Sequence, residues 1–296
     1  MKEEMLPPPP VGGRVGEGVR LFAHSNWDIV PVLAGIAHLA FVIWLFFLIQ
    51  TMPFLQTLPL LILYAISISW NINGVSHNFL HNPYFHSHVL NRAFSLVESL
   101  AIGFSQAFYT WVHNRHHSGN SDRPGENGDT IDWLSIYRHG QGGEPEPVWS
   151  YTFKSFFRDD IKALYKGLYK QSPANARFGV FELCCLGLMV IVMAFISLKA
   201  LLVMILFNYL GNCLSSLNGY FEHYKGNPDK PIAWGVSSYN YLYNLLWFNN
   251  GYHAEHHFRP RMHWRKMKQF HESIREQQRA EGVHVIRHCH ALGFLG

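Results

Sequence analysis

Residues 253–257 read HAEHH and residues 113–117 read HNRHH, so the spacing His-x-x-His-His occurs twice in this chain. On a helix, positions i, i+3 and i+4 share one face, so each triplet turns three imidazoles to the same side. Histidine accounts for 19 of the 296 residues, and even at this abundance two such triplets are not expected by chance. The pattern therefore predicts a site that is built from imidazole side chains.

Long apolar runs flank the triplets and predict an integral membrane protein. Only 15% of the residues are charged and 48% are hydrophobic, which is typical of chains that cross lipid. A helix needs about 20 apolar residues to cross a bilayer. Four segments reach this length, at residues 29–50, 53–72, 179–197 and 200–217. Because each pair is joined by a very short connection, we expect two helical hairpins.

The distribution of basic residues predicts the orientation of these spans. The connections within the two hairpins carry only Lys199, whereas residues 74–178 and 222–296 hold most of the Lys and Arg. The positive-inside rule therefore places both termini and both triplets in the cytosol. An odd number of spans between the triplets would separate them, which also favours four spans. The predicted fold is all-α, with four transmembrane helices in two hairpins and a cytosolic helical cap that carries the histidines.

Two further apolar stretches, residues 93–112 and 239–248, are too polar or too short to cross, and we expect them to lie at the membrane interface. The predicted organisation is one membrane domain, residues 29–275, between two tails, residues 1–28 and 276–296. In the second tail, His284, His288 and His290 are expected to be solvated. The net charge of +4 is modest and the basic residues are spread, so nothing indicates nucleic acid binding.

The histidines predict a centre for two metal ions. Imidazole is a preferred ligand of iron, copper and zinc, whereas magnesium, calcium and manganese prefer oxygen donors. One more pair, spaced i, i+4, follows the second apolar run, and a single histidine follows the fourth. Nine imidazoles exceed the roughly six ligands that one ion takes, but they fit two ions with open positions. The predicted ligands are His77, His81, His113, His116, His117, His223, His253, His256 and His257.

Some assignments around this set stay open. His86 and His88 compete for the first pair, although helical i, i+4 spacing favours the earlier two histidines. Asn249 and Asn250, before the third group, either hold a metal-bound water or form a turn. Nearby acids are candidates to accept the second N–H of a ligating imidazole; they are Asp122, Asp129, Asp132, Glu222 and Glu255.

These motifs resemble the membrane fatty acid desaturase/hydroxylase superfamily. The first box, HNFLH at residues 77–81, is followed by Phe85 and by LNR at residues 90–92, and is similar to bacterial acyl desaturases. The third box lies in NGYHAEHHFRP, residues 250–260, which is close to the family's usual tract. The resemblance covers about residues 30–275. It implies a four-span bundle, a cytosolic cap, two non-haem iron ions and O2-dependent attack on an unactivated C–H bond.

The resemblance further implies a fatty acyl desaturase that introduces a double bond into an acyl chain, with a membrane lipid or an acyl thioester as substrate. The chain carries no fused cytochrome b5 haem motif. Electrons are therefore expected from a separate ferredoxin, rubredoxin or cytochrome b5 with its reductase.

Two alternatives follow from the same residues. YFEHY at residues 220–224 resembles the alkane and xylene monooxygenases, so a hydroxylase, monooxygenase or ketolase acting on an alkyl, lipid or carotenoid substrate is the main one. That branch usually has Asn where Gly219 stands, an extra residue in its middle box and two more spans. A metal transporter or haem carrier is the other alternative, but a transporter should hold ionisable ligands at mid-membrane, and the triplets lie outside the predicted spans.

Overall fold

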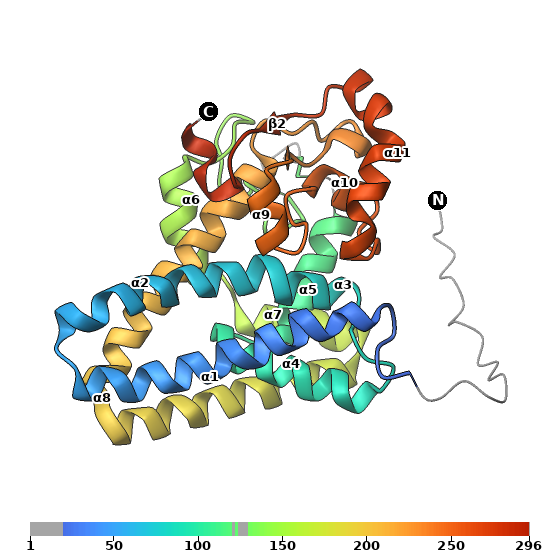
Figure 1. Ribbon diagram of the computed structural model, residues 1–296. Coiled ribbons are helices and arrows are strands. Elements are labelled where there is room, and N and C mark those ends of the chain that lie inside the picture. The colour runs from blue at the N-terminus through green and yellow to red at the C-terminus, as the bar shows by residue number, and fades with distance from the viewer. Residues whose placement is uncertain (1–19, 120–121, 124–129, 296) are drawn as a thin grey trace, which may run out of the picture.

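The computed structural model describes residues 20–119, 122–123 and 130–295, and its regular structure is almost entirely helical (Figure 1). Residues 1–19 of the predicted N-terminal tail, and Asp129, lie outside the described residues. The helices are α1 (Ile29–Thr51), α2 (Phe54–Asn71), α3 (His77–His81), α4 (His88–Ile102), α5 (Gln106–Ser118), α6 (Val148–Lys154), α7 (Ile161–Gln171), α8 (Pro173–His223), α9 (Tyr241–Leu246), α10 (His253–Phe258) and α11 (Met267–Ala280). Shorter elements are the π-turn η2 (Ile72–Ser76), the 3₁₀ turns η1 (Asn26–Asp28), η3 (Ser155–Phe157), η4 (Pro231–Ala233), η5 (Trp264–Lys266) and η6 (His290–Leu295), and the parallel strands β1 (Ser237–Ser238) and β2 (Val285–Ile286).

Among the described residues, three continuous helices are long and apolar enough to cross a membrane. They are residues 26–51, residues 54–81 and α8, which has 51 residues. Inside α8, Ser197 has non-helical backbone angles (φ −160°, ψ 97°), and its hydroxyl accepts a hydrogen bond from the amide of Ala200 at 3.3 Å. The hydroxyl therefore caps the second half of α8, at the place where the sequence predicts the turn of a hairpin.

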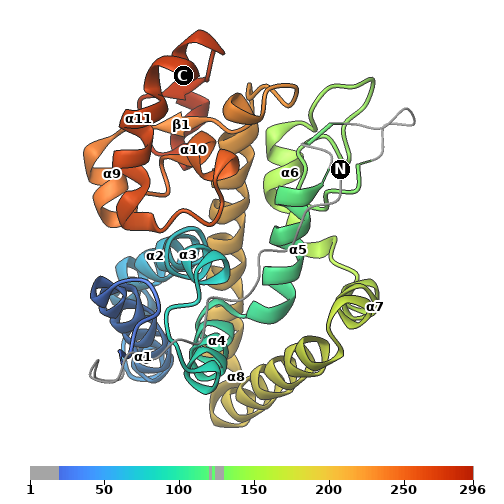
Figure 2. The same ribbon diagram turned by 90° about the vertical axis from the view of Figure 1, so that its right-hand side faces the viewer.

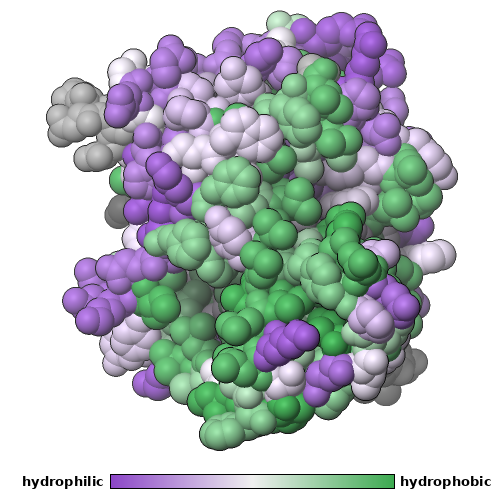
Figure 3. Space-filling view, turned by 90° about the vertical axis from the view of Figure 1, so that its left-hand side faces the viewer, coloured by the Kyte–Doolittle hydropathy of each residue, from purple (hydrophilic) through white to green (hydrophobic). Residues whose placement is uncertain are grey.

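The membrane-length helices form one bundle with α4 (Figure 1). Its buried core joins α1, α2 and α8, where Leu45, Leu61 and Met204 belong to one cluster. A Cβ atom at Gly211 would lie 2.6 Å from the carbonyl oxygen of Ala65, so only glycine lets α8 approach α2 this closely. Figure 3 shows apolar residues spread over the lower part of one face and polar residues gathered over the cap. The outward apolar side chains match a surface that faces lipid.

Two layers build the cap on either side of the upper part of α8 (Figure 2). The segments α9 to α11 and the strand β1, which pairs with β2, lie on one side, and α6 lies on the other; α7 lies lower, at the level of the bundle. The turn η6 packs on α8, where Gly293 lies against the ring of Phe221 without room for a Cβ atom. The last described residues are therefore part of the packed cap.

The structure refines two expectations and corrects one. The stretch predicted as one interfacial segment, residues 93–112, is divided by Gly103, whose φ of +88° ends α4 because glycine adopts this angle without strain. The stretch at residues 239–248 contains α9, whose Tyr241 and Leu242 are 78% and 60% exposed. His290, which was expected to be solvated, is completely buried, because η6 folds back onto α8.

Candidate metal centre

Four segments bring the nine predicted histidines to one place at the base of the cap. The π-turn η2 joins α2 directly to α3, and single π-turns inside helices are frequent at functional sites. Ser105 accepts the amide N–H of Phe108 and so caps the start of α5, which carries the middle triplet. The end of α8 supplies one histidine and α10 supplies the third group. Seven of the nine are buried, and His81 and His117 are half-buried.

The histidines fall into two groups. In the first group, one nitrogen from each of five rings lies within 4.8 Å of all the others. His113 Nε2 lies 3.1 Å from His77 Nε2 and 2.9 Å from His117 Nε2, which in turn lies 3.0 Å from His256 Nε2. The members of this group are His77, His81, His113, His117 and His256.

The second group adjoins the first, with the rings of His117 and His257 only 4.4 Å apart. One nitrogen each from His116, His223 and His257 lies within 4.8 Å of the others. His253 completes this group, because its Nε2 lies 3.2 Å from His223 Nε2 and 2.9 Å from His257 Nε2. The structure therefore brings all nine sequence-predicted histidines together.

The competing histidines lie elsewhere. His86 lines a surface pocket with His24 and Phe22, and His88 is the exposed first residue of α4. Neither belongs to either group of converging nitrogens.

The donor set fits two transition-metal ions. Imidazole nitrogens bind such ions at about 2.1 Å, which places neighbouring ligands of an octahedral site about 3.0 Å apart; the Nε2 pairs here are 2.9–3.2 Å apart. The buried His81 Nε2 has no hydrogen-bond partner among the described residues. Burial, and then the neighbouring imidazoles, hold the pKa values of His113, His256 and His257 well below the ordinary value. Neutral imidazoles whose lone pairs face one another attract a cation.

An acidic and an amide side chain hold the outer nitrogens of two of the rings. His116 Nδ1 donates to Asp132 Oδ2 at 2.5 Å, and His77 Nδ1 lies 3.1 Å from Asn250 Oδ1. Burial acts to lower the pKa of His116, but the carboxylate of Asp132 and further acids outweigh it, so this pKa is raised. Because the outer nitrogens of His116 and His77 are engaged, their inner nitrogens point to the centre. The Nδ1 atoms of His117 and His257 have no hydrogen-bond partner among the described residues.

Of the remaining acids and amides that the sequence offered, some lie beside the histidines and others do not. Asp122 Oδ2 lies 3.2 Å from His223 Nδ1, and Glu222 Oε1 lies 3.6 Å from His253 Nδ1. Glu255 instead accepts hydrogen bonds from side chains outside the groups, at His271, Ser237 and Tyr239. Asn249 has the turn role, since it adopts a φ of +64° and its amide donates to the backbone of Trp264.

Sequence reasoning missed several residues that contact the centre. The ring of Trp234 lies 4.2 Å from that of His257. Behind the histidines, the Tyr243 hydroxyl accepts a hydrogen bond from the amide of Asn250. The amide of Asn218 donates to the carboxylate of Glu222. His290 joins this network through Tyr243, and burial lowers its pKa to about 3, so its imidazole is neutral. No spacing in the sequence connects these positions to the triplets.

A cavity of about 370 Å³ lies next to the first group. Tyr109 lines it, and the ring of Tyr109 lies 5.7 Å from that of His113. Its walls include the apolar side chains of Phe104, Phe108, Val112, Leu164 and Leu183, and polar groups line it at His139, Ser155, Arg158 and Asp159. The cavity therefore offers both an apolar wall and a polar region beside the histidines.

Comparison with known proteins agrees with this geometry. The model of the family described as fatty acid desaturase matches residues 53–288. A protein of Arabidopsis thaliana described as sphingolipid delta(4)-desaturase DES1-like is 26% identical over 194 residues, which cover 64% of this chain and 55% of that protein. The chain thus spans about half the length of this curated relative. No solved structure matches the chain.

Proposed function

The chain belongs to the fatty acid desaturase family, and from this premise we propose that it is an O2-dependent, non-haem di-iron desaturase of the membrane. Its reaction would introduce a double bond into the acyl chain of a membrane lipid or an acyl thioester. One observation carries the proposal: nine imidazoles from four separate segments converge in two adjoining groups. The desaturase relative supports the choice of desaturation over the other oxidations that the sequence leaves open.

The two groups divide the ligands between two irons. The first ion would be held by His77, His81, His113, His117 and His256, and the second by His116, His223, His253 and His257. When bound, the iron pair supplies the oxidising chemistry that removes two hydrogens from neighbouring carbons. The balance requires one O2, two protons and two electrons, and it releases two waters. The electrons would come from a separate ferredoxin, rubredoxin or cytochrome b5 with its reductase.

Four spans account best for the apolar helices. With 51 residues, α8 is about 77 Å long at about 1.5 Å per residue, more than twice the hydrocarbon core of about 30 Å. The non-helical Ser197 lets its two halves form a hairpin. With α1 and α2 as the other hairpin, both histidine groups lie on the side that carries most Lys and Arg, which the positive-inside rule assigns to the cytosol.

The cavity beside Tyr109 is the proposed site of the acyl chain. Apolar walls bind methylene groups without orienting polar atoms, and the region of Arg158 and Asp159 suits a polar head group. We expect Ser216→Phe, which places a ring in the cavity wall, to reduce turnover of long chains more than of short chains while the iron content is unchanged. Leu188→Phe, at a 62% exposed position of the same helix, is the control. Equal chain-length profiles for both variants would exclude this cavity as the substrate site.

Expression of the full chain in a host with a simple fatty acid pool tests the function. Lipid profiling should reveal a new alkene, and the purified protein should hold about two irons. We expect His116→Ala and His256→Ala to lose the product and to bind less iron, because each removes one ligand. His88→Ala, at an exposed histidine outside both groups, should behave like the wild type. An alcohol or ketone product would assign hydroxylase, monooxygenase or ketolase activity instead, and turnover in either ligand variant would refute the metal assignment.

A further inference from the structure

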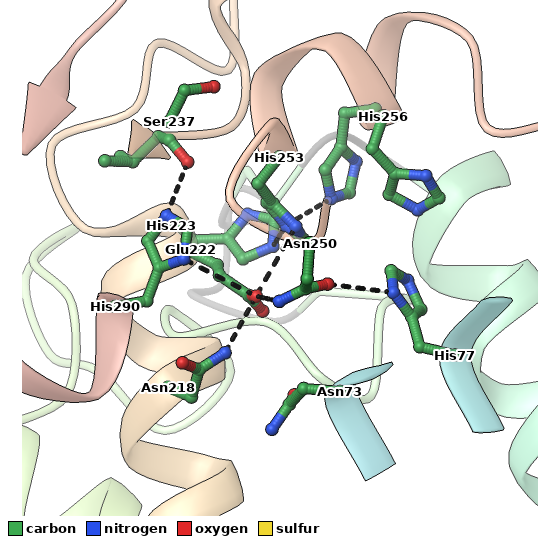
Figure 4. A network of polar contacts seen from close by, with 12 residues as sticks. Asn73, His77, Asn218, Glu222, His223, Ser237, Asn250, His253, His256 and His290 are labelled. Carbon is green, nitrogen blue, oxygen red and sulfur yellow. Dashed lines mark hydrogen bonds and ion pairs between the residues drawn. The ribbon is translucent and has the colours of Figure 1, made fainter. Parts of the chain in front are cut away.

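The turn η6 inserts His290 into the polar network behind the metal centre (Figure 4). His290 Nε2 lies 2.9 Å from the carbonyl oxygen of Val236, and its Nδ1 lies 3.0 Å from the hydroxyl of Tyr243. A carbonyl oxygen only accepts hydrogen bonds, and a neutral imidazole has one donor and one acceptor. The proton of His290 therefore sits on Nε2. Its Nδ1 is the nearer acceptor for the Tyr243 hydroxyl, at 3.0 Å, and Asn218 Oδ1 lies 3.3 Å from the same hydroxyl.

The direction of the next bonds follows from this. Since the Tyr243 hydroxyl donates to His290, its oxygen accepts from Asn250 Nδ2, which lies 3.0 Å away. The same amide nitrogen donates to Glu222 Oε1 at 2.7 Å. Asn250 therefore turns its Oδ1 to His77 Nδ1, 3.1 Å away, and Figure 4 shows Asn250 between Glu222 and His77.

A second contact from η6 fixes the other side of the network. The backbone N–H of Ala291 donates to Asn218 Oδ1 at 3.1 Å, so the amide nitrogen of Asn218 must point to Glu222 Oε1, 2.8 Å away. This oxygen of Glu222 then receives two N–H groups, one from each asparagine. Neither amide can turn over without placing two acceptors or two donors against each other in a buried site.

The chain of bonds ends at a metal ligand. An amide oxygen facing His77 Nδ1 requires the proton of this imidazole to be on Nδ1. His77 Nε2 then keeps its lone pair, and this nitrogen is the one that faces His113 Nε2 at 3.1 Å. Two acceptors set the direction of the bonds: the Val236 carbonyl, which acts through His290 and Tyr243, and Glu222 Oε1. Both orient Asn250, which transmits the direction to the centre.

We propose that His290 is a positioning residue, which acts through Tyr243 and Asn250 to hold His77 in the tautomer that can bind the first metal ion. The proposal rests on the proposed function, because it assigns a role toward the same di-iron centre. It extends that centre beyond the histidine boxes, to a side chain 33 positions after His257, the last histidine of the third box. His290 itself touches neither iron nor substrate.

Two substitutions separate the hydrogen-bonding roles of the two ring nitrogens of His290. His290→Asn keeps an acceptor near the place of Nδ1 and loses the donor at Nε2, whereas His290→Gln keeps a donor near Nε2 and loses the acceptor. Loss of an outer partner of a ligand typically weakens metal binding by about 10–100-fold. We therefore expect His290→Gln to release one of its two irons at least about tenfold faster, and His290→Asn to remain close to the wild type.

The measurements use the purified full-length protein loaded with ⁵⁷Fe(II). Iron per chain, the rate of iron release to a chelator and the Mössbauer spectrum are recorded for the wild type and both variants. In His290→Gln we expect one of the two iron signals to change and the other to stay, which a general loss of stability would not produce. Tyr243→Phe removes the relay hydroxyl and should give the same change. In the double variant, the second substitution should add nothing, since both break one chain of bonds.

The outcomes distinguish this inference from the proposed function. If the wild type binds about two irons but His290→Gln, Tyr243→Phe and the wild type give equal release rates and spectra, the role of His290 is refuted and the di-iron proposal stands. Equal defects in His290→Asn and His290→Gln would also refute it, because packing alone would then explain both. Should His290→Gln not fold, Tyr243→Phe alone decides. A wild type without iron refutes the proposed function, and the role of His290 falls with it.

Discussion

Replacement of Asp132 by asparagine tests how the second group of histidines is held. Asp132 is completely buried; its Oδ2 accepts from His116 Nδ1 at 2.5 Å and its Oδ1 accepts from the backbone N–H of Leu134 at 2.9 Å. Both contacts need an acceptor, and an asparagine offers only one. Whichever way the new amide turns, one N–H group therefore faces another.

The size of the effect follows from these two contacts. A buried donor without a partner costs about 1–3 kcal/mol. If the amide nitrogen faces His116, the proton of the ring must move to Nε2, where it blocks the lone pair that lies 3.1 Å from His223 Nε2. Loss of an outer partner weakens metal binding by about 10–100-fold, which is about 1.4–2.8 kcal/mol at about 1.4 kcal/mol per decade. The two estimates agree, so we expect a loss of this size.

The assay is iron release to a chelator from the purified full-length protein, followed together with iron per chain. We expect Asp132→Asn to release one iron about 10–100-fold faster and to lose turnover in proportion. Asp229→Asn is the control, since this carboxylate is 74% exposed and pairs with Arg123 at the surface. Wild-type release of both irons from Asp132→Asn would refute the argument that the outer nitrogen of His116 needs an acceptor.

Two predictions concern stability. Gly35→Ala should lower the Tm by several degrees in a thermal scan, because its Cβ would overlap a buried oxygen of Glu98 and overpacking costs about 1–3 kcal/mol. Gly187→Ala, at a helical position with open space around it, should not lower the Tm. Equal Tm values for both variants would contradict the close approach of α1 to α4. The second prediction is that stability depends on pH through Glu146. Burial raises the pKa of Glu146, but the hydrogen bonds from Arg158 outweigh this effect and keep the pKa below its ordinary value of 4.5. The pair therefore stabilises the fold fully above about pH 4.5 and loses this contribution as the pH falls through the lowered pKa. In chemical denaturation between pH 6 and 3.5, the free energy of unfolding should fall less steeply with pH for Glu146→Gln than for the wild type. Identical slopes would refute the pairing.

The histidine groups could be predicted from sequence because their pattern is local. Spacing of i, i+3 and i+4 decides which rings share a face of α5 and α10. Hydropathy predicts that α1, α2 and α8 lie in lipid. Even the break in α8 falls near the predicted turn, because Ser197 caps the second half there. These features depend on residues only a few positions apart.

The rest of the centre depends on contacts that no spacing records. His116 meets His223 across 107 positions, and Tyr243 meets His290 across 47 positions. Such pairs form when separate segments pack on α8, and the sequence of residues 276–296 gives no sign of this packing. For the same reason the acids near the triplets could be named as a set, but only the structure separates Asp132, which holds a ring, from Glu255, which turns away.

The inward fold of η6 has a consequence for biogenesis. Translation proceeds from the first residue onward, so the lipid-embedded helices can insert while the segment that carries His290 is still on the ribosome. Until that segment has been synthesised, Asn218 lacks the backbone N–H of Ala291 and Tyr243 lacks its contact with His290. The proposed metal centre would thus be completed late, after insertion, and a nascent chain stalled before residue 290 would reach the bilayer without the contacts of η6 behind it.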